Sequence, residues 1–279
     1  MSNRFSRRSF LAATAAAPLA VAHAKGRSVP VGLELYSVRH EMDKDVLATV
    51  RGVGKMGYDC VEFYGSYYSW TDDYAKKVRA LLDELRMPCH STHNDPEALT
   101  PEGIKRAIEL NKILGSRYIV MASAGEVRGA DGWKRVADTL NQASSAVKGE
   151  GLRVGYHNHD AEWKPVDGQK PIEILSSNTD KSVMLQLDVG TCLETGNDPV
   201  AWIDRNPGRI RSIHCKEWSP EKGYKALFGE GKAEWKKIFD AAEKTGGVEF
   251  YLIEQEGSEY PEMETAKRCL ASCRKLRAS

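Results

Sequence analysis

Two imidazoles and two carboxylates lie near the ends of short apolar segments in the second half of the sequence. They are His157 in "LRVGYHNH" (152–159), Asp188 in "VMLQLDVG" (183–190), His214 in "IRSIHCKEW" (210–218) and Glu254 in "VEFYLIEQE" (248–256). Carboxylate and imidazole ligands without a thiolate suit Mn²⁺, Zn²⁺, Co²⁺ or Mg²⁺. A site of this kind keeps open positions for substrate oxygens, so the four residues predict a divalent metal and Lewis-acid chemistry.

Each of these residues also has a simpler interpretation. Asp188 before "VGT" fits a helix N-cap, and Glu254 fits an ion pair with Lys216. A lone histidine at a strand end is more often a buried core residue than a ligand. Three successive segments carry such residues at equivalent places, however, and this convergence favours the metal site.

The segments that carry these residues belong to a regular alternation of apolar, β-branched stretches with amphipathic ones. Strands are expected at 29–38, 60–65, 88–93, 117–123, 152–159, 183–190, 210–218 and 248–256. Helical patterns lie at 72–86, 102–115, 133–151, 171–178, 198–206, 233–246 and 260–278. This order predicts an α/β fold, a single-domain (β/α)₈ TIM barrel. The competing doubly wound sheet usually has a glycine-rich loop after its first strand, and "GLELYSVRHE" contains no GxGxxG.

In such a barrel the active site forms at the carboxyl ends of the strands. Polar groups there offer directional hydrogen bonds to a polyhydroxylated ligand, and tryptophan rings offer flat faces for stacking. The residues expected to bind substrate are Glu34, Glu62, His93, His159, Lys216, Trp163 and Trp218.

Residues 1–24 have the layout of an export signal. The stretch "SRRSFLAATAAAPLAVAHA" combines paired arginines, a short apolar run and a final A-x-A-like site. The "SRRSFL" core resembles a twin-arginine signal. We therefore expect a periplasmic protein whose barrel occupies residues 25–279. We also expect its six cysteines to be free, because a chain of this size needs no disulfides and can fold before export.

Composition argues against other partners. The net charge is only +1, from 40 basic and 39 acidic residues, so no surface for tracking phosphates is expected and nucleic acid is excluded as a partner. The apolar run of the signal is too short to cross a bilayer, and no membrane span is expected in the mature chain. A homo-oligomer is compatible with the sequence.

From about residue 30 onward the sequence resembles the sugar phosphate isomerase/epimerase superfamily. These are xylose-isomerase-like barrels that include tagatose and psicose epimerases, inosose dehydratase and endonuclease IV. The stretches that carry the resemblance are "GLELYSVR", "GYDCVEFYG", "GYHNHDAEW", "LQLDVG", "HCKEW", "GEGKAEW" and "LIEQEG".

The resemblance implies a divalent metal held by Glu, Asp, His and Glu from the last four strands. Asp188, His214 and Glu254 match the last three of these positions. His157 stands where the family usually has a glutamate, with His159 and then Glu162 as alternatives. The pair of glutamates that exchanges protons across the substrate in the epimerases thus becomes His157 and Glu254.

These implications lead to an expected activity. A divalent-metal-dependent isomerase or epimerase would act on a free sugar or keto-sugar by proton transfer next to a carbonyl, through an enediolate. Glu254, His157 and Lys216 are the expected catalytic residues, with Lys216 offsetting negative charge on oxygen. A lyase or dehydratase eliminating from a keto-sugar or keto-glycoside is the first alternative, because unlike acid and base groups fit elimination at least as well. A non-catalytic periplasmic sugar-binding protein is the second.

Overall fold

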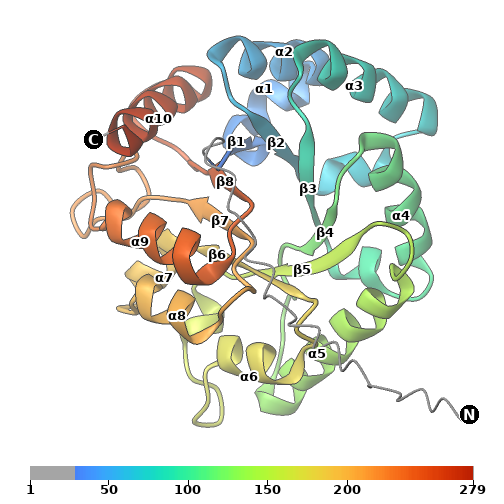
Figure 1. Cartoon of the computed structure of the whole chain (residues 1–279), viewed down its shortest axis with the longest axis vertical. Helices are drawn as coiled ribbons and strands as arrows, with labels where there is room; N and C mark the ends of the chain where they lie inside the picture. Colours follow the sequence, from blue (N-terminus) through green and yellow to red (C-terminus); the bar gives the residue numbers. More distant parts are fainter. Residues whose placement is uncertain (1–28, 279) are drawn as a thin grey trace, which may run out of the picture.

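Eight parallel strands close into a barrel in chain order, with the helices arranged around it (Figure 1). The structure is a computed structural model that describes residues 29–278, so the export signal expected over residues 1–24 lies outside the described residues. The strands are β1 (Val31–Glu34), β2 (Cys60–Phe63), β3 (Cys89–Asn94), β4 (Tyr118–Met121), β5 (Arg153–His157), β6 (Met184–Asp188), β7 (Ser212–Cys215) and β8 (Phe250–Ile253). The predicted (β/α)₈ fold is confirmed, because β1 pairs with both β2 and β8.

The helices that cover the barrel follow the predicted patterns in most places. They are α1 (Arg39–Lys44), α2 (Val46–Met56), α3 (Asp72–Leu85), α4 (Gly103–Leu114), α5 (Gly129–Ala146), α6 (Pro171–Asn178), α7 (Val189–Glu194), α8 (Pro199–Arg205), α9 (Trp235–Ala241) and α10 (Glu262–Arg277). Short 3₁₀ turns are η1 (Leu35–Val38), η2 (Gly65–Ser69), η3 (Pro96–Leu99) and η4 (Ala161–Trp163), and η5 (Ala242–Gly246) is a π-helical turn. Helix α5 was predicted over 133–151 but begins and ends earlier, and α1, α2 and α7 were not among the predicted patterns.

Most strands stop earlier than their apolar segments suggested, and β1 and β6 do so because the chain turns at once into a helical segment. Glu34 is the last residue of β1 and the N-cap of η1, where its carboxylate accepts a hydrogen bond from the Tyr36 backbone N–H. Asp188 is likewise the last residue of β6 and the N-cap of α7. A cap fixes the backbone at the end of its strand, so these polar side chains are held at the mouth of the barrel.

The inside of the barrel is apolar at the amino end of the strands and polar toward the carboxyl end. The apolar layer consists of Cys60, Tyr118, Val120, Met184, Phe250 and Leu252. Side chains two residues further along a strand point to the same face, so Gln186 and Asp188 follow Met184, and Glu254 follows Leu252. The barrel therefore supports its polar mouth on a packed apolar base.

An irregularity between β2 and β3 adjusts this polar region. Val61 pairs with Cys89 but Glu62 pairs with Ser91, so His90 is an extra residue on β3. Such a bulge re-aims the side chains that follow it. It brings Ser91 beside Glu62, and the Ser91 hydroxyl donates a hydrogen bond to Glu62 Oε2.

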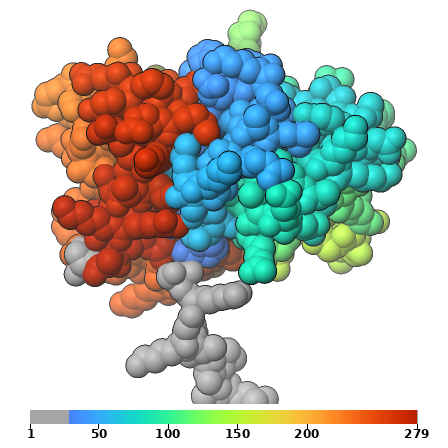
Figure 2. All heavy atoms as spheres, turned by 90° about the horizontal axis from the view of Figure 1, so that it is seen from above, coloured from blue at the N-terminus to red at the C-terminus, as the bar shows by residue number. Residues whose placement is uncertain are grey.

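The two ends of the described chain meet where the ring closes. Figure 2 shows the C-terminal elements in red lying directly against the first described elements in blue, and α10 packs against α2 and η1. Within residues 29–278 no helix is both long and apolar enough to cross a membrane. All six cysteines lie among the described residues, where they are buried and form no disulfide.

Candidate metal centre

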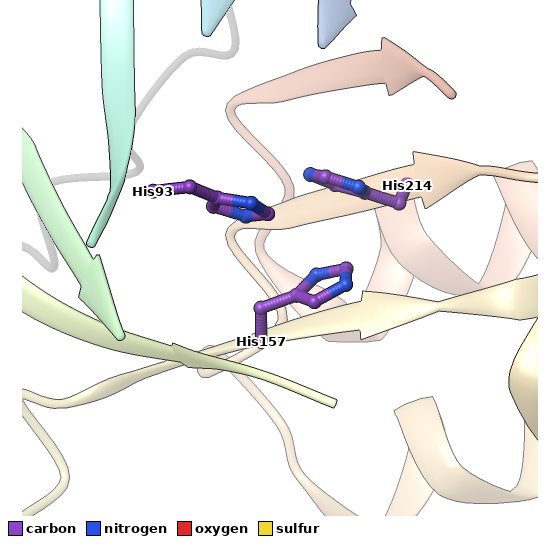
Figure 3. A group of neighbouring side chains, drawn as sticks. All are labelled: His93, His157 and His214. Carbon is purple, nitrogen blue, oxygen red and sulfur yellow. The ribbon is translucent and has the colours of Figure 1, made fainter. Parts of the chain in front are cut away.

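Three histidines from alternate strands converge inside the barrel mouth: His93 of β3, His157 of β5 and His214 of β7 (Figure 3). The ring centre of His157 lies 4.6 Å from that of His93 and 4.3 Å from that of His214. The rings of His93 and His214 stack with centres 4.9 Å apart. Histidines that are 57 to 121 residues apart in the chain thus form one cluster.

The two carboxylate oxygens of Asp188 have different environments. Oδ1 accepts a hydrogen bond from the Thr191 backbone N–H at 2.9 Å and so caps α7. Oδ2 is buried without a hydrogen-bond partner and lies 3.8 Å from His157 Nε2. Buried polar atoms are nearly always paired in folded proteins, so a buried carboxylate oxygen without a hydrogen bond fits the binding of a cation. The simpler interpretation as an N-cap is therefore correct for Oδ1 and leaves Oδ2 free to bind a cation.

His214 lies between two carboxylates. Its Nδ1 is 2.5 Å from Glu254 Oε2, and its Nε2 is 2.7 Å from Glu62 Oε1. Burial alone would lower the pKa of His214, but Glu62 and Glu254 raise it to about 10. Burial would likewise raise the pKa of Glu254, but Lys216 and His214 hold it well below its usual value.

Lys216 brings a positive charge to the same carboxylates. Its Nζ lies 3.4 Å from Glu254 Oε1 and 3.6 Å from Asp188 Oδ2, and it also donates a hydrogen bond to Glu256 Oε1. The side chain is buried, yet the three carboxylates raise the pKa of Lys216 well above its usual value despite the opposing effect of burial. The predicted ion pair between Lys216 and Glu254 is thus present beside the candidate metal ligands.

The residues present fit a divalent cation. Ligand atoms of His157, Asp188 and Glu254 all lie within 4.8 Å of one another, and those of His93, His157 and His214 form a second such group. Three of the four predicted ligands thus form one group, and the fourth, His214, contacts Glu254 at 2.5 Å. Asp188 Oδ2 is the atom of this group that lacks a hydrogen-bond partner. A metal-binding histidine usually donates its other ring N–H to a carboxylate, as His214 can to Glu62.

Four of the residues expected to bind substrate lie at the mouth of the barrel. They are Glu34, His93, His159 and Lys216. Glu34 Oε1 is buried without a partner, 4.0 Å from His93 Nδ1, and burial, then Glu254 and Glu62, raise the pKa of Glu34. His159 is half-buried, with its ring 4.8 Å from that of His157.

Of the other three expected contacts, Glu62 and Trp163 are not available to a ligand. Glu62 is fully buried and its carboxylate is occupied by Ser91, Gln186 and His214, so the structure places it beneath the site. Trp163 is buried in the hydrophobic core with its ring edge-on to that of Trp202, because η4 turns it inward. Trp218 is partly exposed in the loop after β7.

The carboxylate of Glu162, the alternative metal ligand, forms hydrogen bonds with residues near it in the chain instead. It accepts hydrogen bonds from the Tyr156 hydroxyl at 2.6 Å and from the His159 backbone N–H at 2.8 Å. Both of its oxygens are therefore occupied close to β5, away from the cluster of ligand atoms around Asp188.

Sequence reasoning missed two buried residues that organise the mouth. Gln186 joins Glu62, His93 and His157, and its signal was a polar residue two positions before Asp188 in an apolar strand. Glu217 accepts hydrogen bonds from three backbone N–H groups and the Trp235 indole, and so holds the loop after β7. Gly231 is required in that loop, since a Cβ there would collide with Glu217 Oε1.

The missed Tyr224 contacts Lys216 from the same loop. Its ring centre lies 4.7 Å from Lys216 Nζ, a cation–π geometry, and its hydroxyl donates a hydrogen bond to Glu194.

The closed parallel barrel and the imidazole–carboxylate cluster at its mouth define a (β/α)₈ barrel with a candidate metal centre. Residues 50–276 match the family of xylose isomerase-like TIM barrels, and the chain belongs to this family. A sugar phosphate isomerase/epimerase structure from Parabacteroides distasonis is 25% identical, with a TM-score of 0.75 over 91% of this chain and 97% of the other. The structure of the IOLI protein with a bound zinc atom shares the fold, with 14% identity and a TM-score of 0.69 over 88% of this chain and 97% of the other.

Curated relatives are similar over shorter stretches. The inosose dehydratase of Clostridium beijerinckii is 33% identical over 86 residues, which are 30% of this chain and 28% of that protein. The chain spans 28% to 58% of the length of the first curated relatives that it matches. Their activity is therefore a starting point for a proposal about this chain.

Proposed function

We propose that this chain is a divalent-metal-dependent enzyme that removes a proton next to the carbonyl of a sugar or keto-sugar. The observation that carries the proposal is the orphaned Asp188 Oδ2, which lies among ligand atoms of His157 and Glu254 and near the Lys216 ammonium. When bound by His157, Asp188, His214 and Glu254, a divalent ion such as Mn²⁺, Zn²⁺, Co²⁺ or Mg²⁺ supplies a Lewis acid that polarises a carbonyl oxygen.

The protein's own groups account for the proton transfer. Glu254 is a carboxylate whose pKa lies well below its usual value, so it is available as the base. Lys216 lies 3.4 Å from Glu254 and offsets the negative charge that develops on substrate oxygen. Glu34 and His93 at the mouth are placed to bind hydroxyl groups.

The fate of the proton distinguishes elimination from epimerisation. Both ring nitrogens of His157 are committed, with Nδ1 3.1 Å from Gln186 Oε1 and Nε2 facing Asp188. His157 then has no proton to return to carbon, whereas Lys216 has three N–H donors and can stabilise a departing oxygen by hydrogen bonding. The geometry thus favours elimination by a lyase or dehydratase. The curated relatives named inosose dehydratase also support elimination over epimerisation.

Isomerisation or epimerisation is the second candidate. The similarity to the sugar phosphate isomerase/epimerase of Parabacteroides distasonis favours it. The closeness of the His157 and Glu254 ligand atoms also favours it, because two groups near one substrate carbon could exchange a proton with it. This route requires one group to return the proton to the same or the adjacent carbon without loss of a substituent.

An incubation in D₂O separates these candidates. The reconstituted enzyme is mixed with a panel of keto-sugars and keto-glycosides, and products are followed by NMR. Release of water or an aglycone supports elimination, whereas deuterium in an otherwise intact sugar supports isomerisation or epimerisation. Binding without any turnover would instead indicate a sugar-binding protein. The Glu254→Gln variant is the control, since it lacks the proposed base and should release and exchange nothing.

We further propose that the substrate is met in the periplasm, where free sugars and glycosides are more expected than phosphorylated intermediates. The support is the arginine pair and apolar run within residues 1–24. Replacing Arg7 and Arg8 by lysine should retain the protein in the cytoplasmic fraction of a bacterial host, and unchanged export would contradict the twin-arginine route.

A further inference from the structure

A buried amide lies directly beneath the proposed metal ligands. Gln186 of β6 is 1% exposed and every polar atom of its side chain has a partner. Its Nε2 donates to Glu62 Oε2 at 3.0 Å and to Ser212 Oγ at 3.1 Å. Its Oε1 lies 2.7 Å from His93 Nε2 and 3.1 Å from His157 Nδ1.

The orientation of this amide follows from its neighbours. An ionised carboxylate can only accept hydrogen bonds, so the side of Gln186 that faces Glu62 must be the NH₂ group. The donors around Glu62 fit an acceptor, because the Ser91 hydroxyl donates to its Oε2 and the Nε2 atoms of His214 and His93 lie 2.7 Å and 3.1 Å from its Oε1. Gln186 Oε1 then faces the imidazoles as an acceptor, and the nitrogens opposite it must carry protons.

This arrangement determines which nitrogen of His157 can bind a cation. A neutral imidazole has one N–H donor and one lone pair. If Nδ1 donates to Gln186, the lone pair is on Nε2, the nitrogen that lies 3.8 Å from the orphaned Asp188 Oδ2.

His214 differs from His157, because a carboxylate faces each of its ring nitrogens. Its Nε2 lies 2.7 Å from Glu62 Oε1 and its Nδ1 lies 2.5 Å from Glu254 Oε2, so these contacts alone do not distinguish its two nitrogens. Glu62 reaches across the barrel from β2 and is held in place by Ser91 and Gln186. The two histidine ligands therefore depend on one connected layer of hydrogen bonds.

We propose that Gln186, held in place by Glu62, is a positioning residue that selects the tautomer of His157 and presents its Nε2 to the cation. The inference rests on the metal site of the proposed function and assigns a role to Gln186, which lies outside the ligand set. Hydrogen-bonding partners of this kind typically change metal affinity by 10- to 100-fold.

The metal-affinity test is a double-mutant cycle between Gln186 and His157. Gln186→Met keeps the length of the side chain and removes the acceptor, and it should weaken Zn²⁺ binding by about 10- to 100-fold in titrations against a competing chelator. In the background of His157→Glu, whose carboxylate has no tautomer to select, Gln186→Met should weaken binding by less than about threefold. Ser212→Ala is the matched control, since it removes another partner of Gln186 and should leave affinity nearly unchanged.

Equal losses in the two backgrounds would overturn the proposal, because a merely structural role of Gln186 predicts the same loss in both. Thermal unfolding of each variant without metal verifies that the barrel is intact.

A spectroscopic test needs no metal. In protein labelled with ¹⁵N-histidine, long-range ¹H–¹⁵N spectra should show His157 protonated at Nδ1 in the wild type and a changed tautomer population in Gln186→Met. A wild-type His157 protonated at Nε2 would overturn the inference. Failure of wild-type protein to bind any divalent ion would refute the proposed function instead, so the two failures are distinguishable.

Discussion

Replacing Lys216 by methionine is expected to weaken catalysis and to strengthen metal binding at the same time. The Lys216 ammonium lies 3.4 Å from Glu254 Oε1 and 3.6 Å from Asp188 Oδ2, so it neutralises the same carboxylates that would bind the cation. At an effective dielectric constant of about 20, each of these pairs corresponds to a Coulomb attraction of about 5 kcal/mol before desolvation is counted.

The net effect on stability is smaller than this attraction. Removing one partner of a buried ion pair typically costs about 3–5 kcal/mol, because the other charge is left uncompensated. The metal-free Lys216→Met protein should therefore have a free energy of unfolding lower by about that amount. A divalent cation that compensates the carboxylates should recover part of it. Recovery of only about 1.4 kcal/mol would tighten metal binding tenfold.

Catalysis should respond in the opposite direction. Without the ammonium, negative charge on substrate oxygen is less well stabilised, and kcat should fall by about 100-fold or more even when the metal site is saturated. The assay combines metal titration, denaturant unfolding with and without chelator, and turnover at saturating metal. Lys222→Met is the matched control, since Lys222 is exposed and forms an ion pair with Glu230 on the surface. Metal binding that becomes weaker, or a kcat that stays unchanged, would refute the assigned role of Lys216.

Three further predictions concern parts of the barrel outside the ligand set. Glu217→Gln should lower the free energy of unfolding by about 2–3 kcal/mol in urea titrations, since it weakens a buried carboxylate with four donors, whereas the exposed Glu221→Gln should not. Burial, then Arg117, lower the pKa of His90 to about 4. The unfolded state therefore binds the extra proton between pH 6.5 and 4, and His90 should make stability fall by about 2–3 kcal/mol over that window as pH decreases. A His90→Gln variant with an equally steep loss would contradict this. The six buried cysteines should not react with a thiol reagent in the native protein and should give six equivalents after denaturation.

The fold could be predicted because each strand–helix unit has its own local signal. The apolar segments showed where the strands lie, and the number and order of units then favoured a closed barrel. The strand ends could not be located as well, because caps such as Asp188 stop a strand inside a continuous apolar segment. The predicted start of α5 was wrong for a different reason. Its first residues are "GADG", and its amphipathic pattern begins only after them.

Part of the candidate site followed from strand periodicity. Asp188, His214 and Glu254 lie at the ends of the neighbouring strands β6, β7 and β8, and pairing of these strands brings them close to one another. Sequence spacing could not show that Glu62 lies under His214, because that contact joins residues 152 positions apart across the barrel and follows the bulge between β2 and β3. It also could not show that Trp163 turns into the core, since the same residue on the other face of η4 would face the mouth.

Metal content is the property that tests the central claim most directly. Purified wild-type protein, reconstituted with a divalent metal and freed of excess, should retain about one ion per chain. The Asp188→Asn variant should retain none, because its side chain can still cap α7 through Oδ1 but has an amide nitrogen in place of the unpaired Oδ2. Wild-type protein without a stoichiometric ion, or an Asp188→Asn variant that binds the ion equally well, would contradict the account.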